Sequence, residues 1–450
     1  MGLNIPPTLA ARLPLFPTTT HLDETGDGRL TIAGLDLAEL ARQYGTPLYV
    51  YDRASLDATL ARYQAALQTH YPGESGITYA GKAFLCLGIA QWTQQHGLWL
   101  DCTGAGELAV AFAAGVPRPK VLVHGVNKNQ ADLSAALQHA GTLVVDNLGE
   151  LERLAALAST QTGPLPDVWL RLRPGMAVQT HAHTQTGQED SKFGFGPAEL
   201  LQAVGLCLRH DLPLTGLHFH QGSHFHDPAP LAPALDIALD LIEEAQSTYR
   251  WTPQVLSPGG GWGVPYHEDD LPHLPLETYV QFIAEHLVAG CQQRRVPLPR
   301  LHLEPGRSLV AQAGVALYQV GSVKHTLNRR WLLLDGGLAD NPRPALYQAR
   351  YSALPIAGLA RPVSGPAWLG GPFCESGDVL ISGLPLPEIQ PGETIAVPVS
   401  GAYQISMSSN YNGARKPAVL WLEDGRASLL QRRQVPEDLY SRDLPLPPGA

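Results

Sequence analysis

The chain has 450 residues, of which 44% are hydrophobic and 16% are charged, and its formal net charge is -10. A chain of this length and composition can bury one large core and a smaller one, so we expect two domains. Its acidic balance, without clustered lysine and arginine, argues against a nucleic-acid partner and leaves small metabolites as the expected ligands.

Cysteine usage and hydropathy indicate where the protein works. The five cysteines stand at unpatterned spacings, and an odd number suits reduced thiols better than a disulfide framework. No CxxC pair suggests a zinc site, and no apolar run is long enough to cross a bilayer. The N-terminus also lacks a basic start followed by an apolar stretch. We therefore expect a cytoplasmic protein without a resident metal or a membrane span. The cysteines are Cys86, Cys102, Cys207, Cys291 and Cys374.

The first two thirds of the chain show a regular alternation of strands and helices. Residues 1–45 are an N-terminal segment that we expect to join a later β-domain, and "LDLAELARQYGTPLYVYD" predicts a helix followed by a strand. Short apolar runs then alternate with Ala- and Leu-rich helical stretches, which predicts a parallel (β/α)₈ TIM-like barrel over residues 46–311. The eight strand-like runs are "ITYAGKA", "LWLDCT", "VLVHG", "LVVDN", "VWLRLRP", "GLHFHQG", "VLSPGGG" and "LHLEPGR".

After about residue 311 the rhythm changes, and strands follow one another without long helices. Pro/Gly turns separate runs such as "VALYQVGSV", "RWLLLDGG" and "TIAVPVSG". This pattern predicts a C-terminal β-sandwich or β-barrel domain over residues 312–440. The predicted fold class is therefore α/β plus all-β.

Polar residues collect at the predicted strand ends, where the active sites of such barrels lie. The first run ends with Lys82, the sixth with His220, the seventh with three glycines, and the eighth with Glu304 and Arg307. At the apolar open end of a barrel, desolvation disfavours the charged ammonium form of a lysine. The neutral amine then becomes available for Schiff-base chemistry. The alternative is a lysine that reaches the rim and pairs with a carboxylate.

Two further strand ends suit an anion. "PGGGWG" presents consecutive backbone amides without side chains, as an anion-binding nest does, although glycine triplets also mark tight turns. Ser223 can add a hydroxyl donor. Glu304 can hold a ring nitrogen protonated, and Arg307 can grip a phosphate or a carboxylate, unless the two form only a surface ion pair.

The segment "HFHQGSHFH" supports a rival interpretation. His218 and His220 lie on one face of a strand, and such a pair at a barrel mouth can hold zinc in a hydrolase. No aspartate closes the eighth strand to complete that site. His220 can equally pack its ring against an aromatic ligand, and His218, His224 and His226 can be ordinary core or loop histidines.

In their order along the chain, ten motifs resemble those of the fold type III pyridoxal-phosphate decarboxylases. They are "YGTPLYVYD", "YAGKAF", "DCTGAGEL", "THAHTQTGQEDSKFGF", "HFHQGSH", "GGGWG", "EPGRSLVA", "ADNPRPALY", "CESGDVL" and "GAYQISMSSNYNGARKP". The resemblance implies an alanine-racemase-like barrel with pyridoxal 5'-phosphate bound to Lys82, His220 stacked on its ring, and Glu304 paired with its ring nitrogen. The residues that it places around the phosphate are Ser223, Gly259, Gly260, Gly261, Arg307 and Tyr403.

The resemblance also implies a homodimer in which the β-domain of one subunit completes the site of the other. Cys374 then donates the proton that replaces the carboxyl group. The substrate-binding positions that it implies are Arg307, Arg343, Tyr347, Glu375 and Tyr403. Four residues depart from the usual motifs and bear on specificity: Gly81, Phe84, Gln221 and His224.

The expected reaction is the decarboxylation of meso-2,6-diaminopimelate to L-lysine, a step of lysine biosynthesis. Within the same family, the alternative substrates are ornithine, arginine, D-lysine or a siderophore precursor. A non-catalytic pyridoxal-phosphate carrier shares the barrel but has no need of the domain that carries "CESGD". The zinc hydrolase is the remaining alternative.

Overall fold

The computed structural model describes residues 4–23, 28–175 and 190–447. Part of one sequence motif, residues 180–189 in "THAHTQTGQEDSKFGF", lies outside the described residues. The chain folds into two compact units, each made of separated stretches. The barrel unit consists of Ala58–Val264 and Pro272–Leu309, and the β-unit consists of Met1–Asp57, Pro265–Leu271 and Val310–Ala450.

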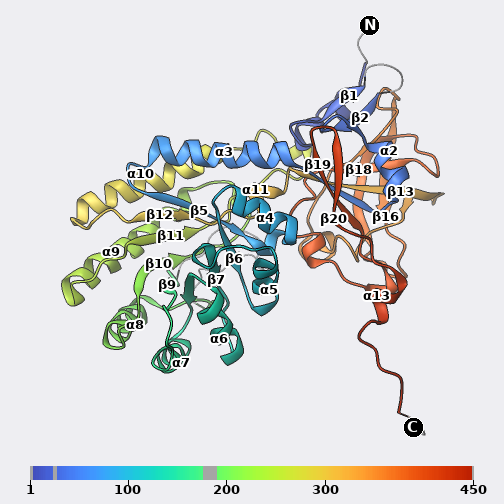
Figure 1. The fold of residues 1–450 in the computed structure, drawn as a ribbon. Coiled ribbons are helices and arrows are strands. Elements are labelled where there is room, and N and C mark those ends of the chain that lie inside the picture. Colours follow the sequence, from blue (N-terminus) through green and yellow to red (C-terminus); the bar gives the residue numbers. More distant parts are fainter. Residues whose placement is uncertain (1–3, 24–27, 176–189, 448–450) are drawn as a thin grey trace. The chain divides into compact units, whose positions relative to one another are not determined.

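The barrel unit is built around a closed ring of parallel strands (Figure 1). The strands follow one another in chain order, and the ring closes where β12 pairs with β5, with Leu301 opposite Ser75. The prediction of a (β/α)₈ barrel is confirmed. The strands are β5 (Ser75–Ala80), β6 (Trp99–Cys102), β7 (Val121–Val123), β8 (Thr142–Val145), β9 (Asp167–Leu172), β10 (Leu214–Phe219), β11 (Val255–Gly259) and β12 (Arg300–Leu303).

Helices lie outside this ring of strands (Figure 1). Two of them begin at asparagine caps: Asn129 accepts the N–H of Asp132 at 3.0 Å, and Asn147 accepts that of Glu150 at 2.9 Å. Each such cap stabilises its helix by about 1 kcal/mol. The helices are α3 (Arg53–His70), α4 (Leu87–Gln95), α5 (Ala105–Ala113), α6 (Gln130–His139), α7 (Leu148–Ala158), α8 (Pro197–Arg209), α9 (Ala232–Tyr249), α10 (Leu276–Arg294) and α11 (Arg307–Val310).

Side chains fill the interior of the barrel. Trp169 packs there with apolar residues of neighbouring strands, and a Cβ on Gly216 would lie 2.5 Å from its indole ring. Only glycine therefore leaves room for Trp169 on the adjacent strand. The residues of this cluster are Leu122, Val144, Trp169 and Val255. Because the interior is packed, the chemistry is left to the strand ends.

The β-unit contains a nine-stranded sheet. Its longest strand, β13, pairs with β4 and β18 along its first half and with β14 along its second half. β4 precedes the barrel in sequence, yet it lies between β13 and β19 in this sheet. The strands are β4 (Leu48–Asp52), β13 (Gly314–His325), β14 (Arg330–Leu334), β15 (Leu354–Pro355), β16 (Val363–Gly370), β17 (Val379–Pro387), β18 (Thr394–Val397), β19 (Ala418–Glu423) and β20 (Arg426–Gln431).

Shorter elements complete the β-unit. Asp36 caps α2 by accepting the N–H of Ala38 at 2.7 Å, and Leu37 and Leu40 of that helix join the apolar core formed with Val315 of β13. The N-terminal strands β1, β2 and β3 form a small separate sheet. These elements are β1 (His21–Asp23), β2 (Arg29–Ile32), β3 (Leu35–Asp36), α1 (Pro7–Ala10), α2 (Leu37–Tyr44), α12 (Arg343–Tyr347) and α13 (Pro436–Tyr440).

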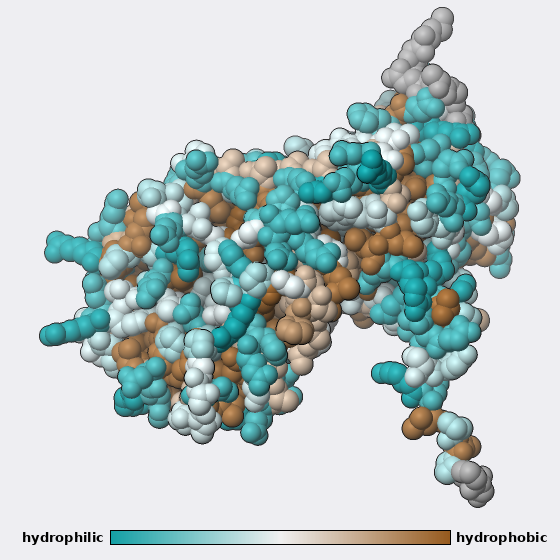
Figure 2. All heavy atoms as spheres, viewed as in Figure 1, coloured by the Kyte–Doolittle hydropathy of each residue, from teal (hydrophilic) through white to brown (hydrophobic). Residues whose placement is uncertain are grey.

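The described helices carry charged and polar residues along their outer faces. On the face shown in Figure 2, hydrophilic side chains cover much of the barrel helices, with smaller apolar areas between them. Among the described residues, no helix combines the length and the hydropathy that a membrane span requires.

Candidate active site

Lys82 lies on a single 3-10 turn, Gly81–Ala83, directly after β5. A Cβ on Gly81 would lie 2.6 Å from the carbonyl oxygen of Asp101, so glycine allows the end of β5 to approach β6 closely. The side chain of Lys82 is exposed, which means that the desolvation expected from the sequence does not arise within this unit. Burial raises the pKa of the nearby Asp101 to about 6, although the charges of His124 and Lys82 oppose this rise. Burial and the charge of Lys82 both lower the pKa of His220.

Glu304 follows β12 and is held by three side chains that lie on, or directly after, other strands of the barrel. Ser257 donates to its Oε1 at 2.7 Å, while Nε2 of His218 and Nε2 of His124 lie 3.2 Å and 3.3 Å from its Oε2. Burial alone would raise the pKa of Glu304, but His218 and His124 lower it well below its ordinary value. The carboxylate is therefore ionised and fixed in orientation.

The two histidines beside Glu304 are themselves buried, and burial lowers the pKa of each. A neutral imidazole at His218 can donate from Nε2 to the carboxylate without adding charge, while His124 lies beside the same oxygen. Within the described ranges, His124, His218 and Glu304 are also the one group whose ligand atoms lie close enough, within 4.8 Å of one another, to hold a metal ion. The zinc hypothesis paired His218 with His220, whereas the structure groups His218 with Glu304.

The glycine triplet that begins with the last residue of β11 packs tightly between the ends of β10 and β12. Gly259 has φ +74°, and a Cβ there would lie 2.6 Å from Nδ1 of His220. A Cβ on Gly260 would collide with the carbonyl oxygen of Glu304, and one on Gly261 with that of Gly222. Larger residues are therefore excluded, and the backbone itself lines this part of the mouth. Burial and the charge of Lys82 hold the pKa of His220 well below its ordinary value, so its ring is neutral.

Ser223 and Arg307 meet beside this glycine loop. Nη2 of Arg307 donates to Oγ of Ser223 at 3.0 Å, and Arg307 is only 8% exposed. Gly306, which precedes Arg307, packs against β5, where its Cβ would lie 3.1 Å from that of Ala80. A cation, a hydroxyl and a backbone turn without side chains together make a place suited to an anion.

Two of the residues that depart from the resemblance lie in the same loop. Gln221 is fully buried, and His224 adopts φ +69°. The backbone N–H of His224 donates to the carbonyl oxygen of Gly261 at 2.8 Å, which joins the loop after β10 to the glycine loop.

Arg343 is the first residue of α12 in the β-unit and is only 5% exposed. Its Nη1 donates to the hydroxyl of Tyr351, and its guanidinium carbon lies 4.4 Å from the ring centre of Tyr266. No carboxylate of the described residues forms an ion pair with it. A buried cation without a counter-ion is costly, so this arrangement suits an incoming anion.

The other predicted residues of the β-unit lie on turns or, for Tyr347, at the end of a short helix. Cys374 and Glu375 are exposed between β16 and β17, and the hydroxyl of Tyr411 donates to Glu375 at 3.4 Å. Tyr403 is half-buried with φ +59°, an unusual conformation for an aromatic residue. Tyr347, which ends α12, is half-buried.

Asp378 shapes the turn that carries Cys374. It accepts the N–H of Leu338 at 2.7 Å and that of Phe373 at 3.0 Å. A Cβ on Gly371 would collide with its carboxylate, so glycine is required there as well. The aspartate of "CESGD" therefore has a structural explanation.

Several site residues were not singled out from the sequence. His124 directly follows the run "VLV", so the strand-end rule contained the signal for it. Ser257 lies within a strand, and its role depends on the register between β11 and β12. Tyr266 and Tyr351 lie in loops, and nothing in their local sequence indicates a partnership with Arg343.

Comparison with known proteins identifies the family. Residues 54–311 match the pyridoxal-binding domain of the pyridoxal-dependent decarboxylases. The diaminopimelate decarboxylase of Bacillus subtilis is 40% identical over 430 residues, which cover 94% of this chain and 97% of that protein. The chain belongs to the pyridoxal-dependent decarboxylase family.

Two solved structures of the family resemble nearly the whole chain. Diaminopimelate decarboxylase of M. jannaschii in co-complex with L-lysine has a TM-score of 0.88 at 28% identity, covering 96% of this chain and 98% of that one. Diaminopimelate decarboxylase of Helicobacter pylori complexed with L-lysine has a TM-score of 0.82 at 29% identity, covering 90% and 98%.

Pyridoxal 5'-phosphate is the cofactor of this decarboxylase family, and the barrel mouth fits its parts. The glycine loop, in which a Cβ on Gly260 has no room, suits the phosphate together with Arg307 and Ser223. The ionised Glu304 suits a protonated ring nitrogen, and Lys82 offers the amine that this cofactor requires.

Proposed function

We propose that this decarboxylase converts meso-2,6-diaminopimelate into L-lysine and carbon dioxide, a step of lysine biosynthesis, with pyridoxal 5'-phosphate as cofactor. The near full-length likeness to diaminopimelate decarboxylases supports this substrate, as does the presence of L-lysine in two similar structures. L-lysine is the expected product, because loss of one carboxyl group from diaminopimelate leaves it.

The buried guanidinium of Arg343 is the observation that carries the substrate assignment. Diaminopimelate has a second amino acid centre, which keeps its carboxylate through the reaction. Arg343 is buried, is held by Tyr351, and has no carboxylate partner among the described residues. A guanidinium binds a carboxylate through two parallel hydrogen bonds, and Glu375 can accept from the distal ammonium. Ornithine has no distal carboxylate for such a clamp.

In the barrel unit, we assign the cofactor's phosphate to Arg307, Ser223 and the glycines Gly259, Gly260 and Gly261. We assign its attachment to Lys82. When bound, pyridoxal phosphate supplies an electron sink for the electron pair left behind as carbon dioxide departs. Glu304 stays ionised because His218 and His124 lower its pKa, and it thereby holds a proton at the ring nitrogen.

Other residues complete the reaction in this proposal. His220 is neutral and offers the face of its ring to the cofactor's ring. Cys374 delivers a proton to the α-carbon after decarboxylation. Tyr403 adds a hydroxyl for the phosphate and the substrate, and Tyr347 lies on the same short helix as Arg343.

We further propose that the active enzyme is a homodimer in which each β-unit supplies Cys374 and Glu375 to the partner's barrel. The exposure of both side chains, on a turn ordered by Asp378, supports this arrangement. We place the reaction in the cytoplasm, since all five cysteines are free thiols and four of them are buried.

The test compares substrates at concentrations below saturation, because specificity lies in the ratio of kcat/KM values. Carbon dioxide release from meso-diaminopimelate should exceed that from L-lysine, D-lysine, L-ornithine and L-arginine. Arg343→Ala should lower kcat/KM for diaminopimelate by about 100-fold, equivalent to about 3 kcal/mol for a buried charge pair. The exposed Arg42→Ala in the same unit is the control. Faster turnover of ornithine or D-lysine would reassign the substrate.

A further inference from the structure

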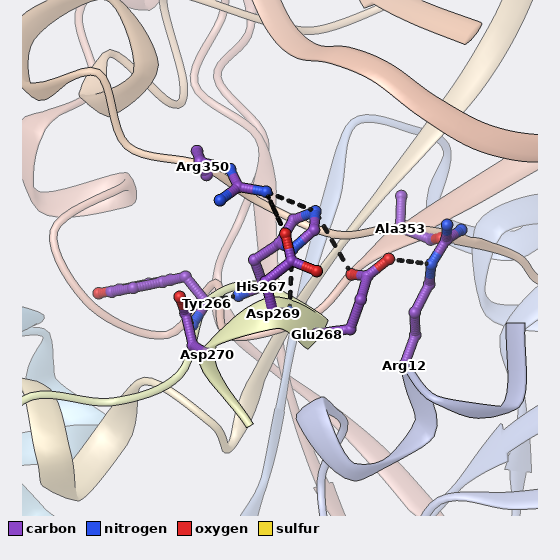
Figure 3. Close-up of polar contacts among 8 residues, drawn as sticks. All are labelled: Arg12, Tyr266, His267, Glu268, Asp269, Asp270, Arg350 and Ala353. Carbon is purple, nitrogen blue, oxygen red and sulfur yellow. Dashed lines mark hydrogen bonds and ion pairs between the residues drawn. The ribbon is translucent and has the colours of Figure 1, made fainter. Parts of the chain in front are cut away.

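The loop Pro265–Leu271 belongs to the β-unit, and the side chains of its own Asp270 and His267 give it a defined shape. Oδ2 of Asp270 accepts the backbone N–H of Tyr266 at 2.9 Å and that of His267 at 3.0 Å. Nδ1 of His267 in turn accepts the N–H of Asp269 at 3.1 Å. Figure 3 shows these residues gathered around the turn. The backbone at Tyr266 is therefore fixed by its own loop.

Two arginines from distant parts of the chain hold this loop from outside (Figure 3). Arg350 contacts Asp269 at 2.7 Å and His267 at 3.3 Å. Arg12 is completely buried; its Nε donates to Glu268 at 2.7 Å and its Nη1 to the carbonyl oxygen of Ala353 at 3.1 Å. These contacts from Arg350 and Arg12 fix the conformation of the loop in addition to its internal hydrogen bonds.

Tyr266 is the side chain that these anchors place. It is 3% exposed, and its ring centre lies 4.4 Å from the guanidinium carbon of Arg343. Its ring also meets that of Tyr351 edge to face, with centres 5.2 Å apart and an interplanar angle of 73°. The guanidinium carbon of Arg343 lies 5.6 Å from the ring centre of Tyr351, whose hydroxyl accepts from Nη1, so the closer ring contact is the one with Tyr266.

These contacts leave the cation of Arg343 oriented without neutralising it. The face of an aromatic ring attracts a guanidinium through its quadrupole, and a phenol accepts one hydrogen bond, but neither carries a negative charge. A carboxylate in their place would satisfy Arg343 permanently and compete with a ligand. Tyr266 and Tyr351 thus leave the guanidinium of Arg343 able to bind an anion.

We propose that Tyr266 is a specificity-determining positioning residue: it holds the guanidinium of Arg343 for the carboxylate of the substrate's non-reacting amino acid centre. This inference rests on the proposed function and adds a residue to it. The loop Pro265–Leu271 is the support that fixes Tyr266 for this role.

The test measures binding of two amines that differ in that carboxylate alone. L-lysine carries it, and cadaverine lacks it. Dissociation constants come from titrating the holoenzyme and following the absorption of the bound cofactor, with calorimetry as a second readout. The wild-type enzyme should prefer L-lysine. Tyr266→Leu should reduce this preference by about tenfold, as expected for loss of a desolvated cation–π contact, and leave cadaverine binding unchanged.

Matched variants separate positioning from packing. Tyr266→Phe keeps the ring and should retain the preference, as should Arg42→Ala, an exposed substitution outside this loop. If Tyr266→Leu does not fold, phenylalanines with increasing fluorine substitution at position 266 keep the shape while weakening the ring's quadrupole. The preference should then fall stepwise with fluorine number.

The outcomes distinguish this inference from the proposed function. A wild-type enzyme that binds cadaverine as tightly as L-lysine would overturn the carboxylate clamp of Arg343, and the inference with it. A wild-type preference that survives in folded Tyr266→Leu, or in the whole fluorinated series, would overturn the inference alone. Equal weakening of both amines would assign Tyr266 a packing role, which also contradicts it.

Discussion

Ser257 donates a hydrogen bond of 2.7 Å to Oε1 of Glu304, from the strand next to the one that Glu304 follows. His218 and His124 contact the other oxygen, so both oxygens of this carboxylate have defined partners. A buried carboxylate fixed in this way needs no reorganisation when charge changes beside it, which is the condition for strong electrostatic stabilisation.

Glu304→Gln should therefore reduce kcat by about 100-fold, since loss of one preorganised electrostatic group costs about 3 kcal/mol. The amide keeps the shape of the side chain but not its charge. Cofactor binding, followed by absorption, should persist. Ser257→Ala is the matched control: it removes one hydrogen bond and should cost only about 1 to 2 kcal/mol of transition-state stabilisation. Nearly full activity of Glu304→Gln would contradict its electronic role.

Lys82 is expected to carry the cofactor. Reduction of the holoenzyme with borohydride, followed by proteolysis and mass spectrometry, should place the pyridoxyl group on the peptide that contains Lys82. Lys128 is an internal control, because it is 2% exposed and is paired with Glu150 at 2.8 Å. Lys82→Ala should bind the cofactor without becoming labelled. Label on any other lysine of the wild-type enzyme would refute the assignment.

The barrel could be predicted because each of its strands is a short apolar run followed by a helix, which is a local signal. The strands with which β4 pairs could not be predicted from the sequence. Its residues Leu48–Asp52 pair with β13 and β19, hundreds of residues away, and no local pattern specifies which distant strand a buried strand joins.

The candidate site likewise contains residues that the sequence indicated and residues that it did not. Strand-end position pointed to Lys82 and Glu304, because barrel topology brings such ends together. The contact between Tyr266 and Arg343 joins a loop, whose shape depends on anchors such as Asp270, to the first residue of α12. Loop conformation of this kind follows from tertiary contacts that the sequence pattern does not contain.

The shared-site arrangement predicts complementation between two inactive variants. Lys82→Ala lacks a barrel residue and Cys374→Ala lacks a β-unit residue, so a mixed dimer has one intact site if each site uses both subunits. Random exchange of equal amounts should restore about a quarter of the wild-type activity, because half of the dimers are mixed and each carries one site of two. Absence of recovery, with exchange proved by mass spectrometry of tagged subunits, would favour a site within one chain.

Asp340 lies in a buried polar cluster of the β-unit. Its Oδ2 accepts from the hydroxyls of Tyr318 at 2.5 Å and Tyr49 at 3.0 Å, and its Oδ1 accepts the N–H of Gly337 at 2.8 Å. Burial raises the pKa of Asp340 to about 6, although these donors oppose the rise. The native state therefore holds a proton on Asp340 more tightly than the unfolded chain does.

This shift sets the sign of a pH effect on stability. The pKa of Asp340 in the folded protein lies above its value of 3.8 in the unfolded chain. The protonated side chain therefore stabilises the native state fully below pH 3.8, and this stabilisation is lost as the pH rises through about 6. Asp340→Asn does not titrate, so the stability of wild type relative to Asp340→Asn should fall by about 1.4 kcal/mol between about pH 5 and about pH 7.5. Urea unfolding at both pH values measures the difference. Asp438→Asn is the control, because Asp438 is half-buried and its hydrogen bond with Arg432 lowers its pKa to about 2, below this pH range. A wild-type advantage that stays constant or grows with pH would show that Asp340 is ionised throughout this range.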